Sequence, residues 1–288
     1  MRADLLARVD GLRTRRTPFV LATVVRAERP TSAKPGDCAV VTADGTLDGF
    51  VGGVCAESTV RVESLRLLAA GESELLRITP DAGAAPAQDG VRTVGNPCLS
   101  GGTLEIFLEA MIPPMLVAVF GESPVARALV RVGAALDWDV RTGLDPLSPD
   151  TSAVVVASHG RGELAVLHAA LSAEVGYIAL VASRRRAAGV LDELGATEGE
   201  RGRIHAPAGL DIGARSAAEI ALSVCAGIVA ARPRVARVPD APAPPGPAVA
   251  VDPVCGMEVL VEDGALQAGD VYFCGPGCLA AWRARATR

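Results

Sequence analysis

Hydrophobic positions in the first 112 residues follow helical spacing in some stretches and form strand-like runs in others. Apolar residues recur at helical spacing in residues 1–15 and 56–70, and Gly71 marks the end of the second helix. Short β-rich runs lie between and after these helices, at 18–25, 37–42 and 103–109. This mixture predicts an N-terminal α+β domain over residues 1–112.

The pattern changes after Pro113 and Pro114, where apolar runs alternate regularly with helical stretches. Such runs are typical of strands that are buried on both faces of a parallel sheet. The alternation predicts a Rossmann-like, doubly wound α/β domain over residues 113–235. Its expected strands are 115–120, 139–142, 153–157 and 177–181, and its expected helices are 124–136, 163–171, 187–194 and 217–231.

Proline then interrupts both kinds of pattern. Residues 239–247 contain five prolines, which predicts a stiff, extended linker over residues 236–248. The remaining forty residues, 249–288, are too few to form a self-sufficient core without a metal or another cross-link. We therefore expect a small cysteine-rich tail domain that folds around a metal.

Composition narrows the class of protein. Half of the 288 residues are hydrophobic, but only 3% are aromatic, so alanine, valine and leucine must fill the core. The net charge of −5 argues against general nucleic-acid binding, which needs a basic surface. No apolar run approaches the roughly 20 residues of a membrane span. Seven cysteines without an export signal fit a reducing compartment, and we expect a cytoplasmic protein.

Three cysteines and a methionine in the tail form a soft-metal pattern. Cys255 is followed after eighteen residues by Cys274 and Cys278, and Met257 lies close to the first of them. Thiolate and thioether ligands together favour Cu(I) or Zn(II). Residues 251–282, with Asp-Pro-Val-Cys-Gly-Met and Tyr-Phe-Cys, resemble the YHS domain, which is related to TRASH-type metal-binding modules. The resemblance implies heavy-metal binding, either in a structural zinc knuckle or for metal delivery.

A second group of candidate site residues surrounds Cys55. Residues 49–57 are typical of a strand, a glycine turn with Gly52 and Gly53, and the start of a helix. A thiol at a helix N-terminus has a lowered pKa, and the free backbone N–H groups there can hold an anion. Glu57, in the first helical turn, either caps the helix or acts as a base.

Cys98 is a further candidate ligand, because Gly101 and Gly102 follow it just before a strand. The chemistry of these motifs leaves two interpretations open: a ligand site, or packing glycines beside buried thiols. Cys38 and Cys225 lie in apolar strand and helix patterns, so we expect them in the core.

Four stretches before the linker resemble the XdhC/CoxI family, whose members are accessory proteins for molybdenum hydroxylases such as xanthine dehydrogenase and carbon monoxide dehydrogenase. The resemblance departs from the family pattern at Val54, where a glycine is expected, and two residues separate Cys98 from its glycine pair. The matching stretches are 29–36, 49–57, 98–108 and 204–222.

The resemblance implies a protein that binds molybdenum cofactor between its first two domains, assists sulfuration of the cofactor and transfers it to an apo-hydroxylase. It implies contact with molybdenum for Cys55 first and Cys98 second. It also implies a phosphate contact for Lys34 and the glycine turn at 49–53. The implied partners are the apo-hydroxylase and a cysteine desulfurase, and a homodimer is plausible. Whether the protein turns over a reaction or only carries cargo is left open, with a carrier favoured.

The turn after the strand at 115–120 departs from the dinucleotide-binding pattern Gly-x-Gly-x-x-Gly. Ser123 and Ala126 replace the second and third glycines, and Glu122 adds a negative charge. A carboxylate at this place repels phosphate, and Ser123 crowds the backbone approach. This turn therefore argues against the alternative function of an NAD(P)-dependent oxidoreductase.

Three polar residues of the second domain are candidates for lining a cofactor site. His159 follows a strand at the edge where open α/β sheets bind ligands, and His205 and Asp211 lie in the last motif of the resemblance. Each is alternatively a loop residue that only makes hydrogen bonds. We expect the basic run at 184–186 to be a solvated turn.

The leading hypothesis is thus a molybdenum-cofactor maturation factor whose tail binds or delivers copper or zinc. Delivery of Cu(I) would suit carbon monoxide dehydrogenases of this class, which carry copper bridged through sulfur to molybdenum. A metal-responsive docking scaffold is the third alternative, in which the tail only senses metal.

Overall fold

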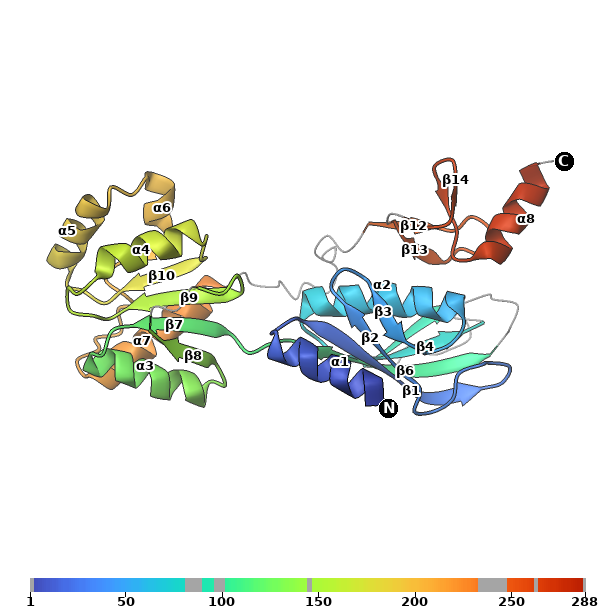
Figure 1. Cartoon of the computed structure of the whole chain (residues 1–288), viewed down its shortest axis with the longest axis horizontal. Coiled ribbons are helices and arrows are strands. Elements are labelled where there is room, and N and C mark those ends of the chain that lie inside the picture. Colours follow the sequence, from blue (N-terminus) through green and yellow to red (C-terminus); the bar gives the residue numbers. More distant parts are fainter. Residues whose placement is uncertain are drawn as a thin grey trace. The chain divides into compact units, whose positions relative to one another are not determined.

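The computed structural model describes residues 3–80, 90–95, 102–143, 147–232, 248–261 and 264–286. The chain forms two compact units (Figure 1). The first unit combines Met1–Pro113 with Val235–Arg288, and the second is Pro114–Arg234. The linker predicted at 236–248 lies outside the described part, except for its last residue. The expected mixed α/β class, with an all-parallel sheet in the second unit, is confirmed.

A six-stranded sheet organises the N-terminal part of the first unit. Its strand order is β3-β2-β1-β6-β4-β5, and all neighbours are antiparallel except β4 and β5. The strands are β1 (Phe19–Glu28), β2 (Cys38–Thr42), β3 (Leu47–Gly49), β4 (Glu74–Thr79), β5 (Val91–Gly95) and β6 (Thr103–Met111); the helices are α1 (Ala3–Thr14) and α2 (Val54–Ala70).

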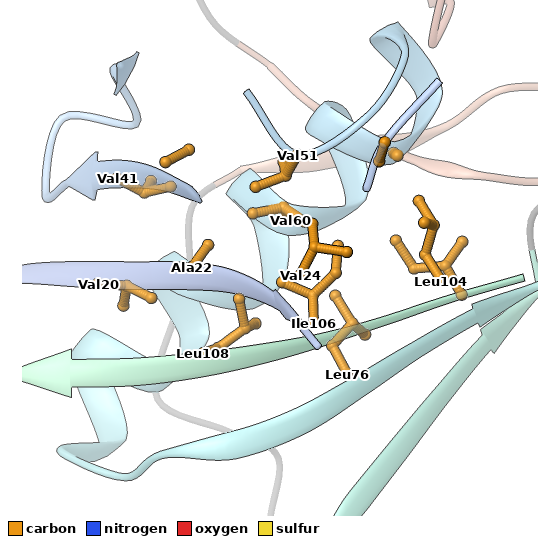
Figure 2. Close-up of a cluster of buried hydrophobic side chains, with 14 of the residues drawn as sticks. Val20, Ala22, Val24, Val41, Val51, Val60, Leu76, Leu104, Ile106 and Leu108 are labelled. Atoms are coloured by element: carbon orange, nitrogen blue, oxygen red, sulfur yellow. The ribbon is translucent and has the colours of Figure 1, made fainter. Parts of the chain in front are cut away.

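Alternating side chains on the central strands form the main core of this sheet. Val20, Ala22 and Val24 of β1 are almost fully buried with Ile106 of β6 and Val60 of α2 (Figure 2). This alternation places the apolar residues of each strand on the face that α2 covers. The opposite face packs against α1, where Leu5 and Leu12 contact Phe19 and Val40.

In the first unit, the two predicted helices agree with α1 and α2 apart from small shifts at their ends. Helix α2 begins at Val54, two residues earlier than expected, so Cys55 belongs to its first turn. Gly71 ends this helix in a left-handed conformation, as predicted. Strands β4 and β5 were not predicted, because charged side chains such as Arg77 interrupt their apolar pattern. Arg77 pairs with Glu105 on the neighbouring strand, a cross-strand contact that the linear sequence does not reveal.

The second unit is built on a five-stranded parallel sheet. Its strand order is β11-β10-β9-β7-β8. The chain therefore reverses its direction of winding between β7 and β9, and this point is where open α/β sheets bind ligands. The strands are β7 (Leu116–Phe120), β8 (Asp139–Thr142), β9 (Thr151–Val156), β10 (Tyr177–Leu180) and β11 (Ile204–His205).

Helices cover both faces of this parallel sheet (Figure 1). Helices α3 and α7 pack together on one face, and α4 and α5 pack on the other. Cys225 of α7 is buried in the first of these cores, as expected. The helices are α3 (Pro124–Ala135), α4 (Glu163–Ser172), α5 (Arg184–Leu194), α6 (Glu198–Arg203) and α7 (Ala217–Ala231). No helix among the described residues is long and apolar enough to cross a membrane.

A buried ion pair fixes the turn between β9 and α4. Both carboxylate oxygens of Glu163, which is 5% exposed, accept hydrogen bonds from Arg186 at 2.6 and 2.9 Å. The backbone N–H of Gly160 donates to the same carboxylate at 2.9 Å, and Ser158 donates at 3.2 Å. The predicted solvated turn at 184–186 is therefore wrong. These residues form the first turn of α5, because Ser183 caps that helix, and Arg186 turns inward to the carboxylate.

The tail, Val249 onward, belongs to the first unit. It consists of two short antiparallel strand pairs and a final helix. Strand β13 packs against α2, so the tail rests on the same helix that covers the N-terminal sheet. The elements are β12 (Val249–Val251), β13 (Glu258–Leu260), β14 (Gln267–Ala268), β15 (Val271–Tyr272) and α8 (Pro276–Ala286).

Removing the guanidinium of Arg186 tests the turn after β9. Arg186→Met leaves the buried Glu163 carboxylate without its charge partner, so the free energy of unfolding should fall by about 2–3 kcal/mol. This is less than for a fully enclosed pair, because the Arg186 side chain is 36% exposed. Chemical denaturation followed by tryptophan fluorescence measures this loss, with Trp138 as the reporter in the second unit and Trp282 as the one in the first. Arg184→Met is the control, since Arg184 pairs with Asp211 only at the exposed surface, and its loss should stay under about 1 kcal/mol.

The ion pair of Glu163 and Arg186 also makes the stability lost in Arg186→Met depend on pH. Burial by itself would raise the pKa of Glu163, but the bonds from Arg186 and Gly160 outweigh it and hold the pKa below its usual value. Its stabilisation is therefore present above the unfolded pKa of about 4.3 and disappears as the pH falls through the lower folded pKa. The difference between wild type and Arg186→Met should shrink toward pH ~3, and a constant difference would contradict this assignment.

Candidate functional site

A tight turn before α2 positions Cys55. Val51 is fully buried in the core, and Gly52 follows with φ of +143°, where a Cβ would lie 3.0 Å from that of Ala56. Gly53 then occupies the N-cap of α2, and no side chain caps the helix. The N–H groups of the first turn and the helix dipole therefore favour negative charge beside Cys55. This environment stabilises a thiolate.

Cys55 does not lie alone at this helix end, because the tail brings three further cysteines to it. Cys274 is 6% exposed, and its thiol is 3.5 Å from that of Cys255 and 3.7 Å from that of Cys278. Cys55 packs against the same buried group and makes a side-chain hydrogen bond with Cys274. We call Cys55, Cys255, Cys274 and Cys278 the four-cysteine cluster. The sequence had separated Cys55 from the other three.

A buried carboxylate organises the tail cysteines. Asp252 is fully buried, and its two oxygens accept backbone N–H groups from Val254 at 2.8 Å and Cys274 at 2.9 Å. Burial acts to raise the pKa of Asp252, but these donors hold it below its usual value. Ligand atoms of Asp252, Cys255, Cys274 and Cys278 all lie within 4.8 Å of one another. Asp252 was not predicted, although it begins the Asp-Pro-Val-Cys motif.

The spacing of these thiols suits a metal and not a disulfide. A disulfide holds its sulfurs about 2.05 Å apart, whereas ligands of a tetrahedral zinc–thiolate site lie roughly 3.8 Å from one another. The observed 3.5 and 3.7 Å fall near the second value. Hydrogen bonding with Cys55 and burial raise the pKa of Cys274, and burial raises that of Cys278 to about 12. A bound cation would offset this cost of ionisation.

Met257, which the sequence predicts as a soft ligand, is a buried member of the same group. Its side chain is 4% exposed and packs with Val259 and Cys274. Its carbonyl oxygen accepts the N–H of Asp252 at 2.8 Å, which closes the loop that carries Cys255. The structure therefore gives Met257 a packing role, and its role as a ligand stays a prediction.

The other predicted site residues of the first unit differ in their burial and contacts. Glu57 is half-buried in the first turn of α2, and burial raises its pKa, although Arg61 acts in the opposite direction. Lys34 is exposed in a turn that its N–H closes with Asp37. Gly102 packs so closely that a Cβ would lie 2.2 Å from the carbonyl oxygen of Pro30, so backbone packing alone requires glycine there. Cys98 and Gly101 lie outside the described residues.

A pocket of about 500 Å³ opens beside the strand pair β2–β3. Asp4, Asp37 and Asp48 contribute to its lining, and this negative charge disfavours a phosphate. Cys38 also lines it and is half-buried, so it packs at the edge of the core formed with α1 and not inside it. It lies at the start of β2, where its thiol is 3.2 Å from the carbonyl oxygen of Gly36.

In the second unit, a pocket of about 850 Å³ lies where the winding of the sheet reverses. The turn after β7 and the turn after β9 line it, with the cationic side chains Arg127 and Arg161. His159 lines this pocket, as predicted, and has a left-handed backbone with φ of +56°. Ser123 uses its hydroxyl to accept the N–H of Ala126 and so caps α3. That N–H is one that a bound pyrophosphate would need.

His159 and Asp211 share a second pocket, of about 680 Å³. Asp211 is exposed there and lies 3.7 Å from Arg184. His205 is not among the residues that line these two pockets; it stacks on Tyr177 with ring centroids 4.0 Å apart. Burial lowers the pKa of His205, which favours the neutral ring. The structure thus brings two of the three polar candidates of this unit together.

Family models of known proteins match residues in both units. Residues 12–79 match the family model described as "XdhC and CoxI family", and residues 117–228 match the one described as "XdhC Rossmann domain". The uncharacterized protein YqeB of Escherichia coli strain K12 is 28% identical over 257 residues, which are 78% of this chain and 46% of that protein. The chain therefore spans just under half the length of this relative.

A solved structure, that of a xanthine dehydrogenase from Bacillus halodurans, covers 81% of this chain and 97% of its own, with 16% identity and a TM-score of 0.37. The two family matches lie in the order of the N-terminal and Rossmann-like domains predicted by the sequence. The chain belongs to the XdhC and CoxI family.

Proposed function

We propose that this protein is a maturation factor for a molybdenum hydroxylase. It binds molybdenum cofactor, assists its sulfuration and takes part in its insertion into the apo-enzyme. The observation that carries the proposal is Cys55 on the uncapped N-terminus of α2, in a chain of this family. A thiol at this place combines a soft sulfur atom with backbone donors for an anion.

The residues near this helix end fit the cofactor chemically. When bound, the cofactor supplies molybdenum on a pterin dithiolene with a terminal phosphate. The N–H groups that follow Gly53 favour an anionic group, and Gly52 keeps the backbone open to close approach. Lys34, the only lysine, is an exposed cation in the turn before β2 and is proposed as the contact to the phosphate.

Two side chains have distinct roles in this proposal. Cys55 contacts molybdenum or protects its sulfido group. Glu57 lies in the same turn of the helix, and burial raises its pKa, so the carboxyl holds a proton more readily than an exposed glutamate does. Glu57 is therefore proposed as a proton donor or acceptor in the first turn of α2. Cys98, with Gly101 and Gly102, is proposed as a second contact.

The tail and the partners complete the proposal. The cysteines of the tail bind zinc or copper. If the metal is Cu(I), the tail delivers it to a carbon monoxide dehydrogenase, which carries copper at its active site. The proposed partners are a molybdenum hydroxylase apo-enzyme and a cysteine desulfurase that supplies sulfur. His159 and Asp211 are proposed to line a cofactor or docking site in the second unit, because they share one pocket.

Truncation of Cys55 tests the cofactor proposal. Cys55→Ala should lower the molybdenum and pterin content of the purified protein by at least about tenfold, because the soft contact to the metal is lost. Mass spectrometry of molybdenum and pterin fluorescence after oxidation measure this content. Cys38→Ala is the matched control, since this thiol lies outside the four-cysteine cluster, and it should retain wild-type content.

A variant of the tail distinguishes cofactor binding at Cys55 from metal binding by the tail cysteines. Cys274→Ser removes a buried tail thiol but keeps Cys55, so cofactor content should persist. If Cys55→Ala retains full molybdenum and pterin content, the proposed cofactor contact is wrong.

Titration with NAD⁺ and NADP⁺ tests the alternative function of a dinucleotide-dependent oxidoreductase. We expect no saturable binding by calorimetry up to about 1 mM, because the Ser123 hydroxyl occupies the N–H of Ala126 and Glu122 adds a negative charge. Binding in the micromolar range would favour the oxidoreductase. Thermal unfolding with and without nucleotide gives an independent reading, since a ligand of the native state raises the midpoint.

A further inference from the structure

We infer that Cys55 is the fourth ligand of the metal site of the tail. The four-cysteine cluster then forms a closed tetrahedral thiolate site for Zn²⁺, and the first 113 residues and the tail both contribute to it. Four thiolates without an open position are typical of structural zinc. A site made by the tail alone would have three thiolates.

The position of Cys55 carries this inference. The tail rests on α2 through β13, and this contact brings Cys274 to the first turn of α2. Cys274 is the central thiol, because it lies 3.5 Å from Cys255 and 3.7 Å from Cys278 and makes a hydrogen bond with Cys55. Three thiols therefore surround it, one of them supplied by α2.

Asp252 is the competing fourth ligand, because its carboxylate lies within 4.8 Å of the three tail thiols. Its hydrogen bonds argue for a supporting role instead. Each of its oxygens already accepts a backbone N–H, from Val254 and from Cys274. The bond to the N–H of Cys274 orients the backbone that carries the central thiol. Outer carboxylates of this kind commonly fix the ligands of a metal site without binding the metal.

The electrostatics of the two helices favour thiolates at this place. Cys55 lies in the first turn of α2, and Cys278 lies in the first turn of α8. The positive ends of two helix dipoles therefore meet at one group of sulfur atoms. Four thiolates around Zn²⁺ carry a net charge of about −2, which such helix ends stabilise.

The consequence is a tail that is attached to α2 through a metal. The tail has few buried hydrophobic residues of its own: Met257, Val259, Leu260, Phe273 and Cys274. A shared zinc site supplies the cross-link that so small a segment needs. Removal of zinc should therefore loosen the tail from α2 and uncover Cys55.

Metal titration of the reduced, cofactor-free full chain tests the fourth ligand. In the wild type, Co²⁺ used as a probe should give the thiolate charge-transfer band of four ligands. In Cys55→Ser this band should fall by about a quarter per bound ion, and competition with a chelator should show Zn²⁺ affinity lower by about 10–100-fold. Cys38→Ser should match the wild type in both measurements, and Asp252→Asn should keep the four-thiolate spectrum.

Alkylation of the wild-type protein gives a second reading that needs no variant to fold. Zinc should protect Cys55 from iodoacetamide together with the three tail cysteines, as followed by peptide mass spectrometry, while Cys38 stays reactive. An unchanged spectrum and zinc affinity in Cys55→Ser, or alkylation of Cys55 that zinc does not slow, would overturn the inference. Because no cofactor is present, neither result depends on the proposed molybdenum site.

Discussion

The close packing between the turn at Gly52 and the start of α2 determines where the chemistry of the first unit lies. The buried Val51 anchors this turn to the sheet core, and the next two residues lead directly into a helix without a side-chain cap. Cys55 is therefore held at a rigid helix end with backbone donors around it. The surface on which the tail rests depends on this same helix.

One sulfur atom consequently serves two proposals. Within a closed four-thiolate zinc site the Cys55 thiolate would be shared with the tail cysteines, so zinc and cofactor would compete for it. If both proposals hold, release of zinc from the tail would uncover the cofactor contact. Metal delivery and cofactor handling then become linked steps at one helix end.

The second unit uses a nucleotide-binding topology with altered chemistry. The larger of the two pockets described above lies where the sheet reverses its winding, as in other doubly wound folds. The Ser123 hydroxyl accepts the N–H of Ala126, a donor that a pyrophosphate would need, and so caps α3. Glu163, paired with Arg186, bonds to Ser158 and Gly160 in the turn after β9. The fold therefore keeps the pocket, while its anion site is changed.

The sequence by itself determined the class of each unit and most helix ends, because apolar spacing and glycine caps are local properties. It also identified every cysteine of the four-cysteine cluster. Only the tertiary structure decided that Cys55 joins Cys274, which lies more than two hundred residues later, because packing of β13 on α2 brings them together. Likewise, the basic run at 184–186 gives no local sign that Arg186 neutralises Glu163. Contacts between distant segments depend on how the elements pack, and no local pattern encodes them.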